Sequence, residues 1–133
     1  MGQLFGIAFK DNQVGVAVGT TGKILSTSDG GMNWEEVKSP SEDTLLKVHY
    51  LGSQLIAIGL RGAVIASTDD GKSWSTNAIP GHYSWLSGIA FMDGTGVVVG
   101  TGGKILATTD DGNIWTRLGI GPIDDGGTRT GEE

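Results

Sequence analysis

Hydrophobic residues along this chain come in short runs, separated by clusters of glycine, aspartate, asparagine and serine. The runs are rich in valine, isoleucine and aromatic residues, which favour extended backbone. No window shows an apolar period of 3.6 residues over a useful length, so helices are not indicated. The pattern predicts an all-β fold made of short strands.

The runs form three successive groups of four. We expect strands over residues 4–10, 14–19, 23–28 and 33–38, over 45–51, 54–59, 63–68 and 73–78, and over 86–92, 96–100, 104–109 and 114–119. Four strands in each repeat of about 40 residues are typical of a β-propeller blade. We therefore expect three four-stranded antiparallel blades within residues 1–121, at about 3–43, 44–84 and 85–121, and a flexible, acidic, glycine-rich tail over 122–133.

One motif recurs before each expected fourth strand, with tryptophans that are 40 and then 41 residues apart. Asp and Ser or Thr oxygens can accept hydrogen bonds from turn amides, and Gly tolerates positive φ. The motif therefore predicts a tight structural turn that ends in a packed Trp. Its residues are Thr27, Asp29, Gly31 and Trp34, then Ser67, Asp69, Gly71 and Trp74, then Thr108, Asp110, Gly112 and Trp115.

Calcium binding is the alternative for this motif, because Asp69-Asp70 and Asp110-Asp111 are adjacent carboxylates. The first copy has Gly30 instead of the second Asp, and the ligand series of an EF-hand loop, with its final Glu, is absent. We therefore expect no metal site and no cofactor.

The pattern Ser/Thr-x-Asp-x-Gly-x-x-Trp resembles the Asp box of BNR-repeat propellers, which occur in sialidases, sortilin-like receptors and related proteins. The longer form, which in the third repeat begins at Gly100 and continues through Gly103-Lys-Ile-Leu106, is most similar to propellers related to the photosystem II stability and assembly factor, a Ycf48-like group. The similarity covers about nine tenths of the chain. The resemblance implies a propeller whose functional face is opposite the Asp boxes.

Three blades are fewer than the four to eight of typical propellers. An open arc would leave two blade faces uncovered, and exposed apolar faces favour association. We expect a homodimer that completes one six-bladed propeller; the alternative is that the chain is a piece of a longer propeller. The residues expected on the open faces are Val16, Val18, Ile24, Ile56, Ile58, Val64, Val97, Val99 and Ile105.

Composition narrows the function classes. The chain of 133 residues has no Cys and a formal net charge of −6, so disulfides and thiolate zinc sites are excluded and nucleic acid is disfavoured as a partner. No signal peptide or membrane-spanning run is visible, and we expect no membrane insertion. The sequence leaves the localisation unknown.

Candidate binding residues lie on the expected face opposite the Asp boxes. Arg61 occupies a short turn and could attract a carboxylate, although a plain surface role is equally compatible. His82, Tyr83 and Trp85 lie in the longest link between blades, where they could bind a ligand or cover the blade core. His49 is expected to be hydrogen-bonded in the fold or to face the channel.

No catalytic residue is indicated. Resemblance to sialidases implies three arginines around a carboxylate, but Arg117 and Arg129 fall on an outer strand and in the tail. The sequence favours a non-catalytic binding or assembly module with a protein or glycan ligand. The alternative is a carbohydrate-binding, lectin-like protein or a reduced glycosidase, since a carboxylate pair could form between copies.

Overall fold

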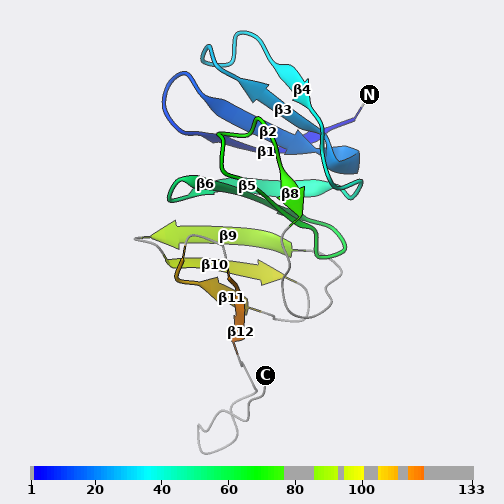
Figure 1. Ribbon diagram of the computed structural model, residues 1–133. Coiled ribbons are helices and arrows are strands. Elements are labelled where there is room, and N and C mark those ends of the chain that lie inside the picture. Colours follow the sequence, from blue (N-terminus) through cyan, green and yellow to red (C-terminus); the bar gives the residue numbers. More distant parts are fainter. Residues whose placement is uncertain (1, 77–85, 93–94, 101–104, 111–113, 119–133) are drawn as a thin grey trace, which may run out of the picture.

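The structure is a computed structural model, and it describes residues 2–76, 86–92, 95–100, 105–110 and 114–118 (Figure 1). Within these residues the strands form three four-stranded antiparallel sheets, in the orders β1-β2-β3-β4, β5-β6-β7-β8 and β9-β10-β11-β12. Their bounds are β1 (Leu4–Phe9), β2 (Gly15–Gly19), β3 (Ile24–Thr27), β4 (Glu35–Val37), β5 (Leu45–Leu51), β6 (Gln54–Gly59), β7 (Val64–Ser67), β8 (Ser75–Thr76), β9 (Leu86–Met92), β10 (Thr95–Gly100), β11 (Ile105–Thr108) and β12 (Thr116–Leu118). A single turn of 3-10 helix, η1 (Thr20–Gly22), joins β2 to β3.

The expected three four-stranded antiparallel blades are confirmed, and each strand begins and ends within two residues of its expected position. The fourth strands begin later than predicted, at Glu35, Ser75 and Thr116. The reason is local: Asn33 and its equivalent Ser73 donate their backbone N–H to the Asp of the preceding turn, at 2.9 Å in both cases, so they belong to the turn.

The blades stack in chain order, with β1 against β5 and β5 against β9 (Figure 1). We call the face of a blade that points to the next blade its front face, and the face that points to the preceding blade its back face. Alternation along the strands places Ile56 and Ile58 on the front face of the second blade, and Leu55 and Ile65 on its back face.

Two hydrophobic cores hold the stack together, one on each side of the second blade. The core between the first and second blades contains Val16, Val18, Ile24, Leu45, Val48, Leu55, Ala57 and Ile65. The core between the second and third blades contains Leu51, Ile56, Ile58, Val64, Ala66, Leu86, Val98, Leu106 and Trp115. Each blade therefore depends on its neighbour for burial, as in other repeat architectures.

The prediction of the open faces was wrong for six of its nine residues. The second blade covers the front face of the first, which buries Val16, Val18 and Ile24, and the third blade likewise covers Ile56, Ile58 and Val64. Val97, Val99 and Ile105 do lie on the front face of the third blade, which no described strand covers. On the first blade the uncovered face is the back face, with Leu4, Ile7 and Phe9 exposed.

Two predicted segments lie outside the described residues: the link Ile79–Trp85 and the tail 122–133. Within the part of the chain that is described, no helix is long and apolar enough to cross a membrane.

Candidate functional site

The Asp-box turns are closed by internal hydrogen bonds. In the first box Thr27 Oγ1 donates to Asp29 Oδ1 at 2.8 Å and accepts the Gly31 N–H at 3.0 Å. Trp34 Nε1 donates to the Gly31 carbonyl at 2.9 Å. The polar groups of the turn thus bind one another, as the sequence predicts.

The second box repeats this network almost atom for atom. Ser67 Oγ donates to Asp69 Oδ1 at 2.7 Å, the Gly71 N–H donates to Ser67 Oγ at 2.8 Å, and Trp74 Nε1 donates to the Gly71 carbonyl at 2.9 Å. Gly31 and Gly71 have φ of +95° and +88°, which an L side chain rarely adopts. In the third box Thr108 and Ile114 donate to Asp110 Oδ1, and Gly112 lies outside the described residues.

In the first two boxes these bonds favour the charged form of the Asp carboxylate. The hydrogen bonds from Asn33, first from its backbone and then from its side chain, lower the pKa of Asp29 to about 2. The Ser73 hydroxyl and then its backbone N–H lower the pKa of Asp69 to about 2. Among the described residues no group of three or more His, Cys, Asp and Glu side chains could hold a metal ion.

Arg61 lies at the end of the molecule opposite the boxes, in the turn between β6 and β7, with a positive φ of 59°. Its Nε is 3.3 Å from Asp43 Oδ1, and the Arg61 side chain is exposed. The guanidinium therefore already has a carboxylate neighbour from the link that precedes β5. The other predicted binding residues, His82, Tyr83 and Trp85, lie outside the described residues.

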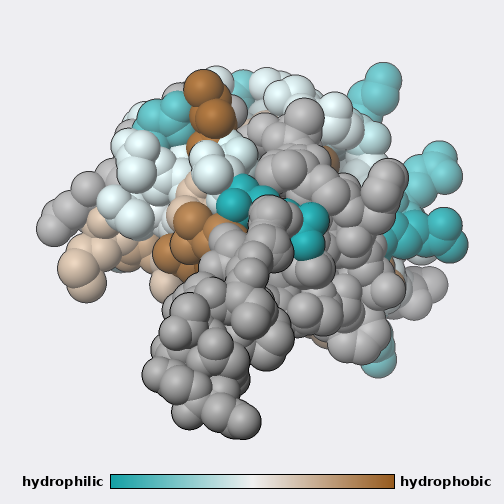
Figure 2. Space-filling view, turned by 90° about the horizontal axis from the view of Figure 1, so that it is seen from below, coloured by the Kyte–Doolittle hydropathy of each residue, from teal (hydrophilic) through white to brown (hydrophobic). Residues whose placement is uncertain are grey.

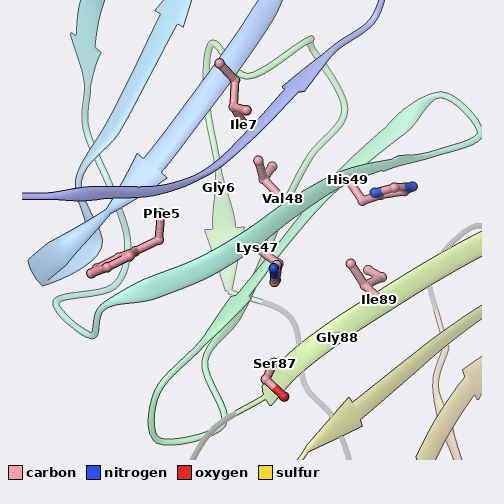
Figure 3. A pocket seen from close by; sticks show the side chains of 9 residues that line it. All are labelled: Phe5, Gly6, Ile7, Lys47, Val48, His49, Ser87, Gly88 and Ile89. Carbon is pink, nitrogen blue, oxygen red and sulfur yellow. The ribbon is translucent and has the colours of Figure 1, made fainter.

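A pocket of about 450 Å³ lies along the three inner strands, β1, β5 and β9 (Figure 3). It is lined by Phe5, Gly6, Ile7, Lys47, Val48, His49, Ser87, Gly88 and Ile89. In a closed propeller the innermost strands surround the central channel, so this pocket lies on the side of the blades that forms the channel wall when the ring is complete. We call it the inner-strand pocket.

Lys47 and His49 of β5 are both exposed in this pocket. Within the described part of the chain Lys47 forms no ion pair. Lys47 pairs with Ile58 in the sheet, close to the strand end that is joined to the Arg61 turn. The pocket thus places a positive charge in the channel wall, toward the end opposite the Asp boxes.

Sequence reasoning missed Lys47, although the repeat contained a signal. The first and third blades have Gly-x-Ala at the corresponding positions, Gly6 to Ala8 and Gly88 to Ala90, whereas the second blade has Lys47 and His49. A site on a repeat protein can be sought where one repeat departs from the others. His49 was expected to be hydrogen-bonded or to face the channel, and it lines the inner-strand pocket.

The fold and the three boxes define a BNR-type β-propeller. A family model described as "Photosynthesis system II assembly factor YCF48" matches residues 2–84 and 34–127. The chain therefore belongs to this family, and the predicted resemblance is confirmed.

Solved structures of the same family are similar to this chain over only part of their own length. "YCF48 bound to D1 peptide" is 26% identical with a TM-score of 0.72, and the match covers 88% of this chain and 39% of that one. "YCF48 from Cyanidioschyzon merolae" is 29% identical with a TM-score of 0.70, over 92% of this chain and 39% of that one. Three blades thus span about two fifths of these relatives.

A more distant likeness shows the fold alone. The GH74 enzyme of Niastella koreensis is 20% identical with a TM-score of 0.63, and the match covers 88% of this chain and 18% of the enzyme. No curated protein matches the chain.

Proposed function

We propose that this protein is a non-catalytic binding and assembly module that presents a polypeptide-binding surface in its channel wall, toward the end opposite the Asp boxes. The observation that carries the proposal is the inner-strand pocket, whose lining is both polar and apolar and includes the exposed ammonium group of Lys47. A pocket of mixed character with one ammonium group suits a ligand that is partly apolar and carries a carboxylate.

Family membership supports a polypeptide as the ligand. The relative described as YCF48 bound to D1 peptide holds a peptide, and the present chain matches it over most of its own length. We propose an extended segment with at least one carboxylate, because Lys47 could pair with that charge. Arg61 could take part at the same end of the molecule, but only by sharing its guanidinium with Asp43.

Peptide titration tests this function. Fluorescence anisotropy would compare labelled acidic peptides with the same peptides in which Asp and Glu are replaced by Asn and Gln. We expect Lys47→Gln to weaken binding of the acidic peptides up to about fivefold, since an exposed ion pair contributes at most about 1 kcal/mol. Lys72→Gln is the matched control, because Lys72 is also exposed but lies in an Asp-box turn.

The result can contradict the proposal in two ways. Equal binding of the acidic and neutral peptides would exclude the carboxylate contact, and equal loss in both lysine variants would place binding elsewhere. Hydrolysis of a fluorogenic glycoside by the purified protein would contradict the non-catalytic assignment.

We also propose that two copies complete one six-bladed ring. The two uncovered faces, on the first and third blades, support this arrangement, because six blades lie within the usual range for a closed propeller. Light scattering at micromolar concentration tests it by measuring the molar mass.

A further inference from the structure

The third blade ends the described stack with a front face that repeats the front face of the first blade. Ala8, Val16, Val18, Ile24 and Val37 of the first blade correspond to Ala90, Val97, Val99, Ile105 and Leu118 of the third. In the first blade this face is covered: Val18 is 0% exposed, whereas its equivalent Val99 is 40% exposed. Figure 2 shows hydrophobic side chains reaching the surface on the side of the third blade.

The first blade, at the start of the described stack, has an uncovered back face. Its back face carries Leu4, Ile7, Phe9, Ala17, Leu25 and Trp34, which correspond to Leu45, Val48, Tyr50, Ala57, Ile65 and Trp74 of the second blade. The second set packs against the first blade, whereas no described strand packs against the first set. Ile7 is 60% exposed, whereas its equivalent Val48 is 5% exposed.

From these equivalences we infer that the back face of the first blade of one copy packs on the front face of the third blade of a second copy. The contact between the first and second blades, which the structure shows in full, is the template for this contact. The inference rests on the proposed self-association of two copies, and it specifies which face of one copy contacts which face of the other. Each contact joins two different faces, and two such contacts close the ring.

Backbone spacing is compatible with this pairing. Gly6 allows β5 to approach the first blade, because a Cβ at Gly6 would be 3.0 Å from Lys47 Cα and 3.1 Å from the Leu46 carbonyl oxygen. Gly88 occupies the equivalent position on the third blade. Within the described residues, a Cβ at Gly88 would meet only Val99 Cγ2 nearby, at 2.8 Å. The third blade therefore keeps the space into which an inner strand can approach.

The charged residues near the proposed contact are also compatible with this pairing of faces. Lys10 of the first blade pairs with Asp70 of the second, with Nζ 3.2 Å from Oδ2. At the proposed contact the corresponding positions are Met92 of the third blade and Gly30 of the first blade of the other copy. Neither carries a charge, so the contact leaves no ion unpaired at this point. The Lys23–Glu36 ion pair lies on the back face of the first blade, where both residues keep their partner.

A complementation experiment tests which faces meet. Ile7→Asp alters only the back face of the first blade and Val99→Asp only the front face of the third, and both residues are exposed within one copy. In a head-to-tail ring either substitution damages both contacts, so each variant alone should have the molar mass of one chain. A mixture of the two variants should recover the mass of two chains, because one of its two contacts contains no substitution.

Met32→Lys is the matched control, since Met32 is exposed in an Asp-box turn and the same position in the second blade is Lys72. This control should keep the mass of two chains.

A dimer that survives in one of the two face variants would mean that like faces meet, which contradicts the inference. Failure of the mixture to recover, with both variants folded by circular dichroism, would also overturn it, while a monomeric unsubstituted chain would contradict self-association itself. Peptide binding is measured separately and does not decide between these outcomes.

Discussion

Gly6 lies directly against Lys47, and the space between the two backbones is too small for a side chain on Gly6. A Cβ on Gly6 would be 3.0 Å from Lys47 Cα. This contact joins the inner strands of the first and second blades. The equivalent Gly88 has no such neighbour among the described residues. The same residue in two repeats therefore has two different environments, and the difference gives a direct prediction.

Gly6→Val should destabilise the folded chain, because the new side chain would separate β1 from β5. Overpacking of a tight contact costs about 1–3 kcal/mol. Gly88→Val should destabilise the single chain less than Gly6→Val, because within the described residues its Cβ would meet only the Val99 side chain and no neighbouring backbone, and it should reduce the fraction of dimer. Urea unfolding and light scattering of both variants measure the two effects. An equal loss of stability in both would show that Gly88 is already enclosed.

The box tryptophans Trp115 and Trp34 should differ in their contribution to stability. Trp115 is 6% exposed in the core between the second and third blades, and Trp34 is half-buried beside Phe9, with ring centroids 6.2 Å apart. Trp115→Ala should cost about 3–5 kcal/mol, as for other buried aromatic residues. Trp34→Ala should cost less in the single chain, because its face has no covering blade. Thermal unfolding measured below the dissociation constant would rank them, and the reverse order would contradict the stacking.

The box carboxylates predict loss of stability in acid. Asp29 and Asp69 have pKa values of about 2 in the folded protein, below the ordinary value near 3.9 that we assume for the unfolded chain. A carboxyl group with a lowered pKa contributes stability that is complete above its unfolded pKa and is lost as the pH falls through its folded pKa. The urea midpoint should therefore fall between about pH 4 and pH 2.

Asp69→Asn separates this effect from general acid unfolding. The variant should be less stable than the unsubstituted chain at neutral pH, because the Ser73 and Ser67 hydrogen bonds to a carboxylate are stronger than those to an amide. Its midpoint should then change less between about pH 4 and pH 2. An identical pH dependence in the two proteins would mean that Asp69 is not the titrating group.

Binding at the inner-strand pocket should depend on ionic strength. Lys47 is exposed, so salt screens its attraction for a ligand carboxylate. Affinity for an acidic peptide should fall as sodium chloride is raised, and this fall should be smaller in Lys47→Gln. Isothermal titration calorimetry at two salt concentrations measures both slopes. A slope that Lys47→Gln leaves unchanged would remove Lys47 from the site.

Much of the fold could be predicted because the repeat fixes local structure. The period of the tryptophans and the Ser/Thr-x-Asp turns determine where strands end, and the hydrogen bonds of Thr27 and Asp29 are local in sequence. Strand alternation also separates Val18 from Ala17 onto opposite faces. These features depend on neighbours within one blade, which a sequence pattern records well.

Which faces remain uncovered could not be predicted, because that depends on the direction in which the blades stack. Val18 and Val99 occupy the same position in their repeats, yet the second blade buries Val18, whereas Val99 is exposed. The inner-strand pocket likewise depends on three strands far apart in the chain. Only the substitution of Lys47 for the repeated glycine indicated it in advance.

The molar mass of the unsubstituted protein tests the central claim most directly. Multi-angle light scattering at micromolar concentration should give twice the chain mass of 13.8 kDa, as two sets of three blades complete one ring. A monodisperse, folded species at 13.8 kDa would contradict the proposed ring and, with it, the pairing of the first and third blades.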